Sequence, residues 1–245
     1  MTNRLLLLLL LPFLFLSCTS EEEPTETDSP SNSINKIMPL GASRVEGARP
    51  DFESYRYELW KLMVDGGWDF DYVGTNDDLS SYPSYLGFTF DNDHEGRGGW
   101  TSGQILQGIE GWLNETDTPD IILFSSPGGN DALQNLPYEE AVSNINQIID
   151  IIQIANPNVT IIIEQMAPAL SSEMTAELTT YFNRMQEEVS SIASAQTTAS
   201  SNVLTVNMYT GFDDTLLADA VHYNEAGAKF IAERYYTVLT SILEQ

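Results

Sequence analysis

The sequence has one cysteine, Cys18, and few basic residues. With a single cysteine the chain can form no internal disulfide, so a folded domain must be stabilised by its core alone. Ten Lys and Arg residues stand against 36 Asp and Glu residues, which gives a formal net charge of −26. Because this charge repels a phosphate backbone, we expect no nucleic acid partner. Only 2 of the 245 residues are histidines, so candidates for a catalytic base are few.

The N-terminus is predicted to be an export signal. Arg4 precedes an apolar run from Leu5 to Leu16, which is too short to span a bilayer and is typical of a secretory signal. The run ends in Leu16-Ser17-Cys18, which resembles the bacterial lipoprotein signal, in which the cysteine is acylated and becomes the new N-terminus. An ordinary signal peptide with an incidental cysteine is the alternative.

We therefore predict a signal peptide over residues 1–17, an acidic Ser/Thr/Pro tether over 18–35 and one domain over 36–245. The tether has almost no side chain to bury. Several acyl chains on Cys18 would anchor the exported protein stably to a bacterial membrane. The run Ser20-Glu21-Glu22-Glu23 also resembles the surface-export signal of some Gram-negative lipoproteins, which favours exposure at the cell surface.

From Lys36 onward, short β-branched runs alternate with amphipathic patterns. Expected strands are Ile37–Leu40, Phe70–Val73, Ile121–Phe124, Thr160–Ile163 and Val203–Val206. Expected helices are Tyr55–Val64, Ser102–Leu113, Tyr138–Ala155, Met174–Ala195 and Glu225–Leu243. This alternation predicts an α/β fold, a three-layer α/β/α sandwich with a five-stranded parallel sheet between two helix layers. The stretch from Gly74 to Gly99 is expected to be a binding loop.

In such a sheet the ligand binds beyond the carboxyl ends of the strands, where three candidate loops meet. Ser43 follows the first strand and is a candidate nucleophile, although a serine after a glycine is more often an ordinary turn residue. Asp219 lies three residues before His222, close enough to orient the imidazole and to stabilise its charged form. Alternatively, His222 is a surface or capping residue. Candidate donors for an oxyanion are the backbone amides of Ser43 and Gly99 and the side-chain amide of Asn130.

Four sequence blocks match, in order, those of the SGNH (GDSL-type) hydrolases: Gly41-Ala42-Ser43, Gly99, Gly128-Gly129-Asn130-Asp131 and Asp219-Ala220-Val221-His222. Further residues, among them Ile37-Met38-Pro39-Leu40-Gly41 and His94-Glu95-Gly96, resemble carbohydrate esterase family three. The resemblance covers Lys36 to Leu243. It implies a flavodoxin-like sheet, Ser43 as the nucleophile, His222 as the base, Asp219 as its orienting acid, and Ser43, Gly99 and Asn130 as the oxyanion hole.

Members of that family that resemble this chain are acetyl xylan esterases. The resemblance therefore implies a serine esterase that removes O-acetyl groups from a polysaccharide such as acetylated xylan, through an acyl-enzyme and without a cofactor. One alternative is an esterase of the same mechanism that acts on a short-chain lipid or on an acylated cell-envelope glycan. Another is a carbohydrate-binding relative that has lost catalysis, since Ala42 stands where the family usually has aspartate.

Arg44, Trp100 and Tyr223 are candidate substrate-binding residues. For Trp100 and Tyr223 the reason is that aromatic rings suit the faces of pyranose sugars. For Trp100 the alternative is packing beneath the loop.

The cluster between Asp91 and Glu95 is rich in oxygen atoms. We interpret it as a solvated loop in which His94 and Glu95 brace the following glycine turn, with a Ca²⁺ site as the alternative, and we predict no metal. Glu164, near the end of an expected strand, is interpreted as a cap or turn residue.

Overall fold

The computed structural model describes residues 34–78 and 80–244. The predicted signal peptide, Cys18 and the tether up to residue 33 lie outside the described residues. Asn35, which we placed in the tether, is buried, donates to the carbonyl oxygens of Asp69 and Glu244, and accepts from the Glu244 amide. The folded part therefore includes at least one residue more than expected. In the described part, no helix has the length and apolar character needed to cross a membrane.

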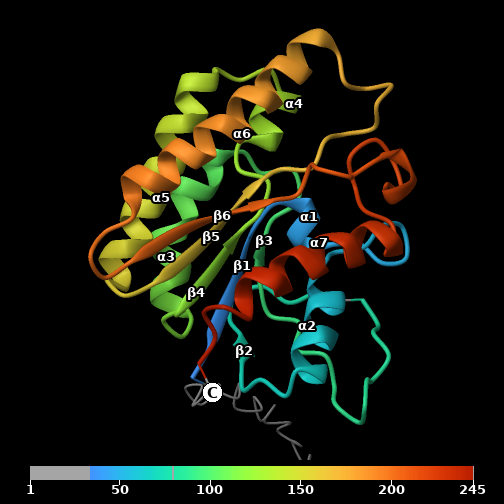
Figure 1. Ribbon diagram of the computed structural model, residues 1–245, viewed down its shortest axis with the longest axis vertical. Coiled ribbons are helices and arrows are strands. Elements are labelled where there is room, and N and C mark those ends of the chain that lie inside the picture. Colours follow the sequence, from blue (N-terminus) through green and yellow to red (C-terminus); the bar gives the residue numbers. More distant parts are fainter. Residues whose placement is uncertain (1–33, 79, 245) are drawn as a thin grey trace, which may run out of the picture. The chain divides into compact units, whose positions relative to one another are not determined.

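A parallel sheet forms the centre of the domain, with the strand order β2-β1-β4-β5-β6 (Figure 1). These strands are β1 (Lys36–Gly41), β2 (Asp71–Tyr72), β4 (Ile121–Phe124), β5 (Thr160–Gln165) and β6 (Asn202–Asn207). A sixth strand, β3 (Glu95–Gly96), pairs with the end of β1 outside this path. The five predicted strands are present. β3 lies in the stretch that we expected to be a loop, and it was not predicted because two residues show no periodicity.

Helices cover both faces of the sheet, which confirms the three-layer arrangement. Figure 1 shows α3 (Ser102–Glu115), α5 (Tyr138–Ala155) and α6 (Ala176–Gln196) on one side, and α2 (Arg56–Asp65) and α7 (Glu225–Leu239) on the other. The short helices α1 (Ser43–Glu46) and α4 (Gly129–Leu133) and the 3₁₀ turn η1 (Asp214–Leu216) lie in the connecting segments and were not predicted. The last helix ends four residues earlier than expected.

The strands bury side chains on both faces, as their continuous apolar runs predict. In β4, Ile122 and Phe124 belong to the core beneath α3, α5 and α6, whereas Ile121 and Leu123 belong to the core beneath α2 and α7. Successive strand residues point to opposite faces, so one short run supplies both cores.

The end of β1 approaches the end of β4 closely, and this contact requires a glycine. A Cβ atom at Gly41 would lie 2.8 Å from Val45 Cγ2 and 3.0 Å from the Ser125 carbonyl oxygen. Since real side chains do not tolerate such distances, glycine lets the chain turn directly from β1 into α1. Ser43 is thereby placed at the carboxyl edge of the sheet.

Candidate active site

Three side chains from two distant parts of the sequence form a continuous hydrogen-bonded chain at this edge. His222 Nε2 lies 2.8 Å from Ser43 Oγ, and His222 Nδ1 lies 2.7 Å from Asp219 Oδ2. Ser43 begins α1, while Asp219 and His222 lie in the segment between η1 and α7. The structure thus brings together the three residues that the sequence singled out for nucleophilic chemistry.

Asp219 also folds the loop that carries His222. Its Oδ1 atom accepts from the Val221 amide at 2.9 Å and from the His222 amide at 2.8 Å. Partial burial raises the pKa of the Asp219 carboxyl. The hydrogen bonds from the His222 side chain and the two amides have the larger, opposite effect, so the pKa lies below its usual value. An ionised Asp219 only accepts, so Nδ1 of His222 carries the proton and Nε2 is left to accept from the Ser43 hydroxyl.

The His222 ring is also held from its face by Phe52. The two ring centroids are 3.8 Å apart and the planes differ by 10°. Phe52 reaches this position because the neighbouring Glu53 amide donates to the Tyr223 carbonyl oxygen at 2.8 Å. Sequence reasoning missed Phe52, since an isolated aromatic residue in an irregular segment carries no periodic signal.

Arg44 and Tyr223, both predicted to bind substrate, are instead part of the protein interior. Tyr223 is 0% exposed and lies beneath the Arg44 guanidinium, whose carbon is 4.8 Å from the ring centroid. The prediction for Tyr223 is therefore wrong, because a fully enclosed ring has no face for a sugar.

Arg44 is buried and donates to three backbone carbonyl oxygens, those of Val221 at 2.8 Å, Ala167 at 2.9 Å and Pro168 at 3.0 Å. Its guanidinium thereby joins the helix of Ser43 to the loop of His222 and to the segment after β5. Arg44 also lines the cavity beside Ser43, but these bonds use most of its donors, so its main role in the structure is to position the loops.

The candidate oxyanion donors lie at the same edge. Asn130 is in α4, and its Nδ2 atom donates to the Trp100 carbonyl oxygen at 2.8 Å, which fixes the amide while leaving it a second hydrogen to donate. Gly99 has φ of +76° in the turn before α3, and Gln134 holds this turn by donating to its carbonyl oxygen at 3.1 Å. Both donors therefore sit on braced backbone rather than on free loops.

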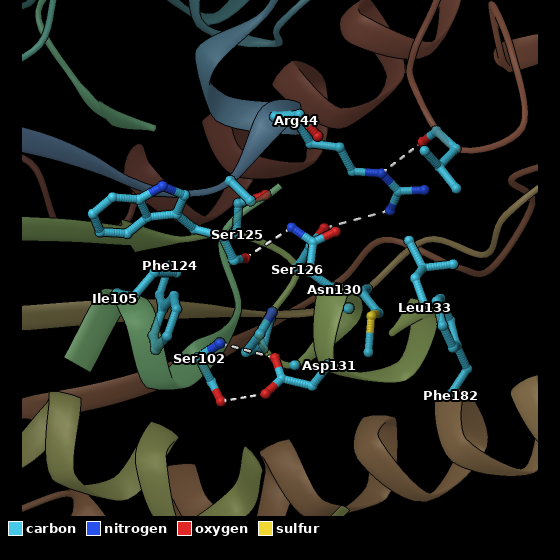
Figure 2. Close-up of a pocket in the computed structure, with 18 residues that line it drawn as sticks. Arg44, Ser102, Ile105, Phe124, Ser125, Ser126, Asn130, Asp131, Leu133 and Phe182 are labelled. Atoms are coloured by element: carbon cyan, nitrogen blue, oxygen red, sulfur yellow. Dashed lines mark hydrogen bonds between the residues drawn. The ribbon is translucent and has the colours of Figure 1, made fainter. Parts of the chain in front are cut away.

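The first turn of α3 is tied to α4 by a buried carboxylate. Asp131 accepts from the Ser102 amide at 2.9 Å and from the Ser102 hydroxyl at 2.6 Å, as Figure 2 shows. Asn144 of α5 donates to the same hydroxyl at 3.0 Å. These bonds fix the position of the neighbouring Asn130 side chain relative to Trp100.

A small cavity of about 50 Å³ adjoins Ser43 (Figure 2). Apolar side chains of Ile105, Phe124 and Phe182 line it, together with Trp100 and Asn130. Trp100 also packs against Trp112, with ring centroids 5.6 Å apart. It thus combines the two alternatives considered from the sequence, since it contacts the cavity and packs beneath the loop.

The cluster between Asp91 and Glu95 is engaged by protein groups. His94 Nδ1 accepts from the Gly96 amide at 2.8 Å, while Glu95 pairs with Arg97 at 2.8 Å. Burial, with the charges of Arg56 and Arg97, lowers the pKa of His94 to about 2, so its ring is neutral. Across residues 34–78 and 80–244, no group of three His, Cys, Asp or Glu side chains is arranged to hold a metal ion.

A serine, a histidine and an aspartate joined in this order beside amide donors, at the carboxyl edge of a parallel sheet, define a serine hydrolase of the α/β class. The model of the GDSL-like Lipase/Acylhydrolase family matches residues 63–230, which include Asn130 and His222. The chain belongs to this family. It is a carboxylic ester hydrolase of the SGNH type, as the resemblance implied.

Solved structures of carbohydrate esterases are similar over nearly their whole length. A family 3 carbohydrate esterase from Clostridium thermocellum is 31% identical, with a TM-score of 0.68, and the match covers 86% of this chain and 99% of that one. A family 3 carbohydrate esterase from Talaromyces cellulolyticus is 28% identical, with a TM-score of 0.74 and coverage of 85% and 98%. A serine-to-alanine mutant of an acetyl esterase, solved with an acetate ion, is 27% identical, with the same TM-score and coverage. No curated protein sequence gives a significant match.

Proposed function

We propose that the protein hydrolyses O-acetyl esters of a polysaccharide such as acetylated xylan, with Ser43 as the nucleophile. The observation that carries this proposal is the chain from Asp219 through His222 to Ser43, with distances of 2.7 and 2.8 Å. Both distances lie within hydrogen-bond reach, so the serine proton has an acceptor and the acceptor has an orienting partner.

The reaction proceeds in two steps. His222 Nε2 takes the Ser43 proton while Oγ attacks the ester carbonyl carbon, and the negative charge that develops on the carbonyl oxygen is met by the amides of Ser43, Gly99 and Asn130. The sugar alcohol leaves with the proton from His222, and an acetyl-serine remains. Water, deprotonated by His222, then attacks the acetyl group and releases acetate.

Two observations support an acetyl group and a carbohydrate alcohol. The similar structures include an acetyl esterase solved with acetate and two family 3 carbohydrate esterases. The cavity beside Ser43 is small, about 50 Å³, and its walls are largely apolar, which suits a short acyl group better than a long one. Ala42, which prompted the non-catalytic alternative, accepts from the Val45 and Glu46 amides only through its carbonyl oxygen and lies outside the chain of catalytic hydrogen bonds.

The test is acetate release by residues 34–245 from acetylated xylan and from 4-nitrophenyl esters of increasing acyl length. We expect release to be greatest with acetyl substrates and to be lost in Ser43→Ala, with Ser190→Ala on the exposed face of α6 as the matched control. Release from acetylated xylan that persists in Ser43→Ala would place the nucleophile elsewhere. Activity on the 4-nitrophenyl esters without any on the glycan would retain the mechanism and reject the substrate.

A second candidate is an ester with a more apolar acyl or alcohol group, such as a short-chain lipid. It is favoured by Leu133 and Leu136, which are 42% and 41% exposed. Both line a groove that shares Leu133 and Val221 with the cavity at Ser43. A preference for butyryl or hexanoyl over acetyl esters in the same panel would favour this candidate.

We also propose that Cys18 is acylated after export and anchors the enzyme to a bacterial membrane. The support is the sequence alone, the apolar run of Leu5 to Leu16 followed by Ser17-Cys18. Detergent phase partitioning of the full chain expressed in a bacterial host tests this. We expect the wild type in the detergent phase and Cys18→Ser in the aqueous phase, and equal partitioning of the two would reject the anchor.

A further inference from the structure

A buried carboxyl group that the reaction does not use lies directly below the active site. Glu164 is in β5, is 0% exposed, and points to the same face as Ile162, toward α2 and α7. The sequence interpretation of this residue as a cap or turn residue is wrong, because it is an interior strand position. A carboxyl group in such a place is costly unless it makes bonds that the fold needs.

The bonds that Glu164 makes are to one residue of the loop after β4. Its Oε2 atom accepts from the Ser126 amide at 2.8 Å and from the Ser126 hydroxyl at 3.3 Å. Arg44 donates to the same hydroxyl at 3.4 Å. Ser126 is thus bonded both to Glu164 and to Arg44, the residue that follows the nucleophile.

The remaining groups around the carboxyl are polar but uncharged, apart from Arg44. The hydroxyls of Tyr235 in α7 and Ser125 in the loop after β4 lie near Glu164. Glu164 in turn contributes to the raised pKa values of Tyr55 and Tyr223. Burial raises the pKa of Glu164, and the nearby Tyr235 hydroxyl, the bond from the Ser126 amide, the charge of Arg44 and the nearby Ser125 hydroxyl lower it only in part. Tyr235 of α7 thus lies near the same carboxyl group as the loop after β4.

Ser126 has a backbone conformation that serine rarely adopts, with φ of +47°. Side chains other than glycine disfavour this left-handed region, so surrounding contacts must hold it. The turn it starts is short, since the Gly129 amide donates to the Ser126 carbonyl oxygen at 3.0 Å and α4 begins at Gly129. Asn130 follows at once, so a change of φ at Ser126 would move its side-chain amide.

We propose that Glu164 is a positioning residue for the oxyanion hole: it holds Ser126 in the left-handed conformation and thereby sets where the Asn130 amide meets the substrate's carbonyl oxygen. This inference rests on the role proposed above for Asn130. It does not depend on which glycan or alcohol the enzyme acts upon, because the oxyanion is common to all esters.

The primary variant is Glu164→Met, which keeps the volume and removes both acceptor atoms. With 4-nitrophenyl acetate we expect kcat to fall by about 100-fold, since small displacements of catalytic groups have effects of this size, and KM to change by less than about 2-fold. Glu164→Asp, which is too short by one methylene to reach Ser126, is expected to lose about 10-fold in kcat while retaining a buried carboxyl group. Glu164→Gln keeps an acceptor for the Ser126 amide and should recover most of the activity. Glu187→Gln, exposed on α6, is the matched control.

Two double variants separate positioning from a general effect on the fold. Glycine adopts positive φ at no steric cost, so Ser126→Gly should restore at least about 10-fold of the kcat lost in Glu164→Met. In an Asn130→Ala background, Glu164→Met should cause little further loss, because both act on one hydrogen bond. If Glu164→Met lowers kcat in the Asn130→Ala background by the same factor as in the wild type, the inference is overturned. A folded Glu164→Met or Glu164→Asp with wild-type kcat would also overturn it. A wild-type rate in Asn130→Ala alone would instead reject the proposed oxyanion hole.

Discussion

The ring of Phe52 lies flat against the imidazole of His222, with centroids 3.8 Å apart and an interplanar angle of 10°. The stack fixes the ring plane, while Asp219 fixes which edge of the ring faces Ser43. Position and direction of the base are thus set by two residues that lie 167 positions apart in the sequence.

We expect Phe52→Ala to lower kcat for 4-nitrophenyl acetate by roughly 10-fold, because the imidazole gains freedom to rotate away from Ser43. KM should change little, since Phe52 contacts the base rather than the ester. Phe52→Tyr, which retains the ring, is the control and should stay close to wild type. Equal kcat values for all three proteins would show that Asp219 alone suffices to orient His222.

We expect Asn130→Ala to slow turnover by about 10²- to 10³-fold, corresponding to roughly 2.7 to 4 kcal/mol of lost transition-state stabilisation. The reason is that the charge on the carbonyl oxygen loses one of its three proposed donors. Steady-state kinetics with 4-nitrophenyl acetate measures this. Asn183→Ala, at an exposed position of α6, is the control. An unchanged rate would remove Asn130 from the site.

Arg44→Lys is expected to lower the free energy of unfolding by roughly 3 kcal/mol. A lysine ammonium cannot reach the carbonyl oxygens of Val221, Ala167 and Pro168 together, so buried acceptors are left without partners. Urea unfolding followed by tryptophan fluorescence measures the change. The exposed Arg184→Lys serves as the comparison and should be neutral, and a similar result for both variants would contradict the buried role of Arg44.

Asp91 predicts a pH dependence of stability. Burial, followed by the charges of Asp93 and Asp71, raises its pKa from 3.8 to about 7, although the Tyr72 amide donates to it at 2.6 Å. Between these two values the folded state binds a proton that the unfolded state has released, so the contribution of Asp91 to stability falls as the pH rises from about 4 to about 7.

Asp91→Asn removes this titration and retains an acceptor for the Tyr72 amide. We therefore expect the variant to gain stability relative to wild type as the pH is raised from 5 to 8, by about 1 to 4 kcal/mol. Urea unfolding at several pH values tests this. A constant difference between the two proteins across that range would show that Asp91 does not titrate there.

Most of the fold could be predicted from the sequence, because the long strands and helices have strong periodicity. The runs Ile121–Phe124 and Ile161–Ile163 are apolar without interruption, which is typical of parallel strands buried on both faces. The elements that were missed, β3, α1 and α4, have two to five residues each. Such short elements form because neighbouring strands and loops position their backbone, and no local pattern encodes those contacts.

The reactive residues were easier to identify than the residues that position them. Ser43, Asp219 and His222 stand out because their types and spacing suit one reaction. Phe52 and Glu164 do not, since their roles come from contacts made across the fold. Tyr223 shows the opposite error, because an aromatic residue beside a predicted catalytic histidine suggests a sugar platform, yet its ring is enclosed beneath Arg44.

The contact between Asn35 and Glu244 places both ends of the described chain at the amino edge of the sheet. Ser43 lies at the other edge, beyond the six residues of β1, which span about 20 Å. Residue 34, where the described part of the chain begins, therefore lies at the edge of the sheet opposite the catalytic edge. A group joined directly at Ile34 would attach at the edge of the sheet away from Ser43 and leave the catalytic edge free.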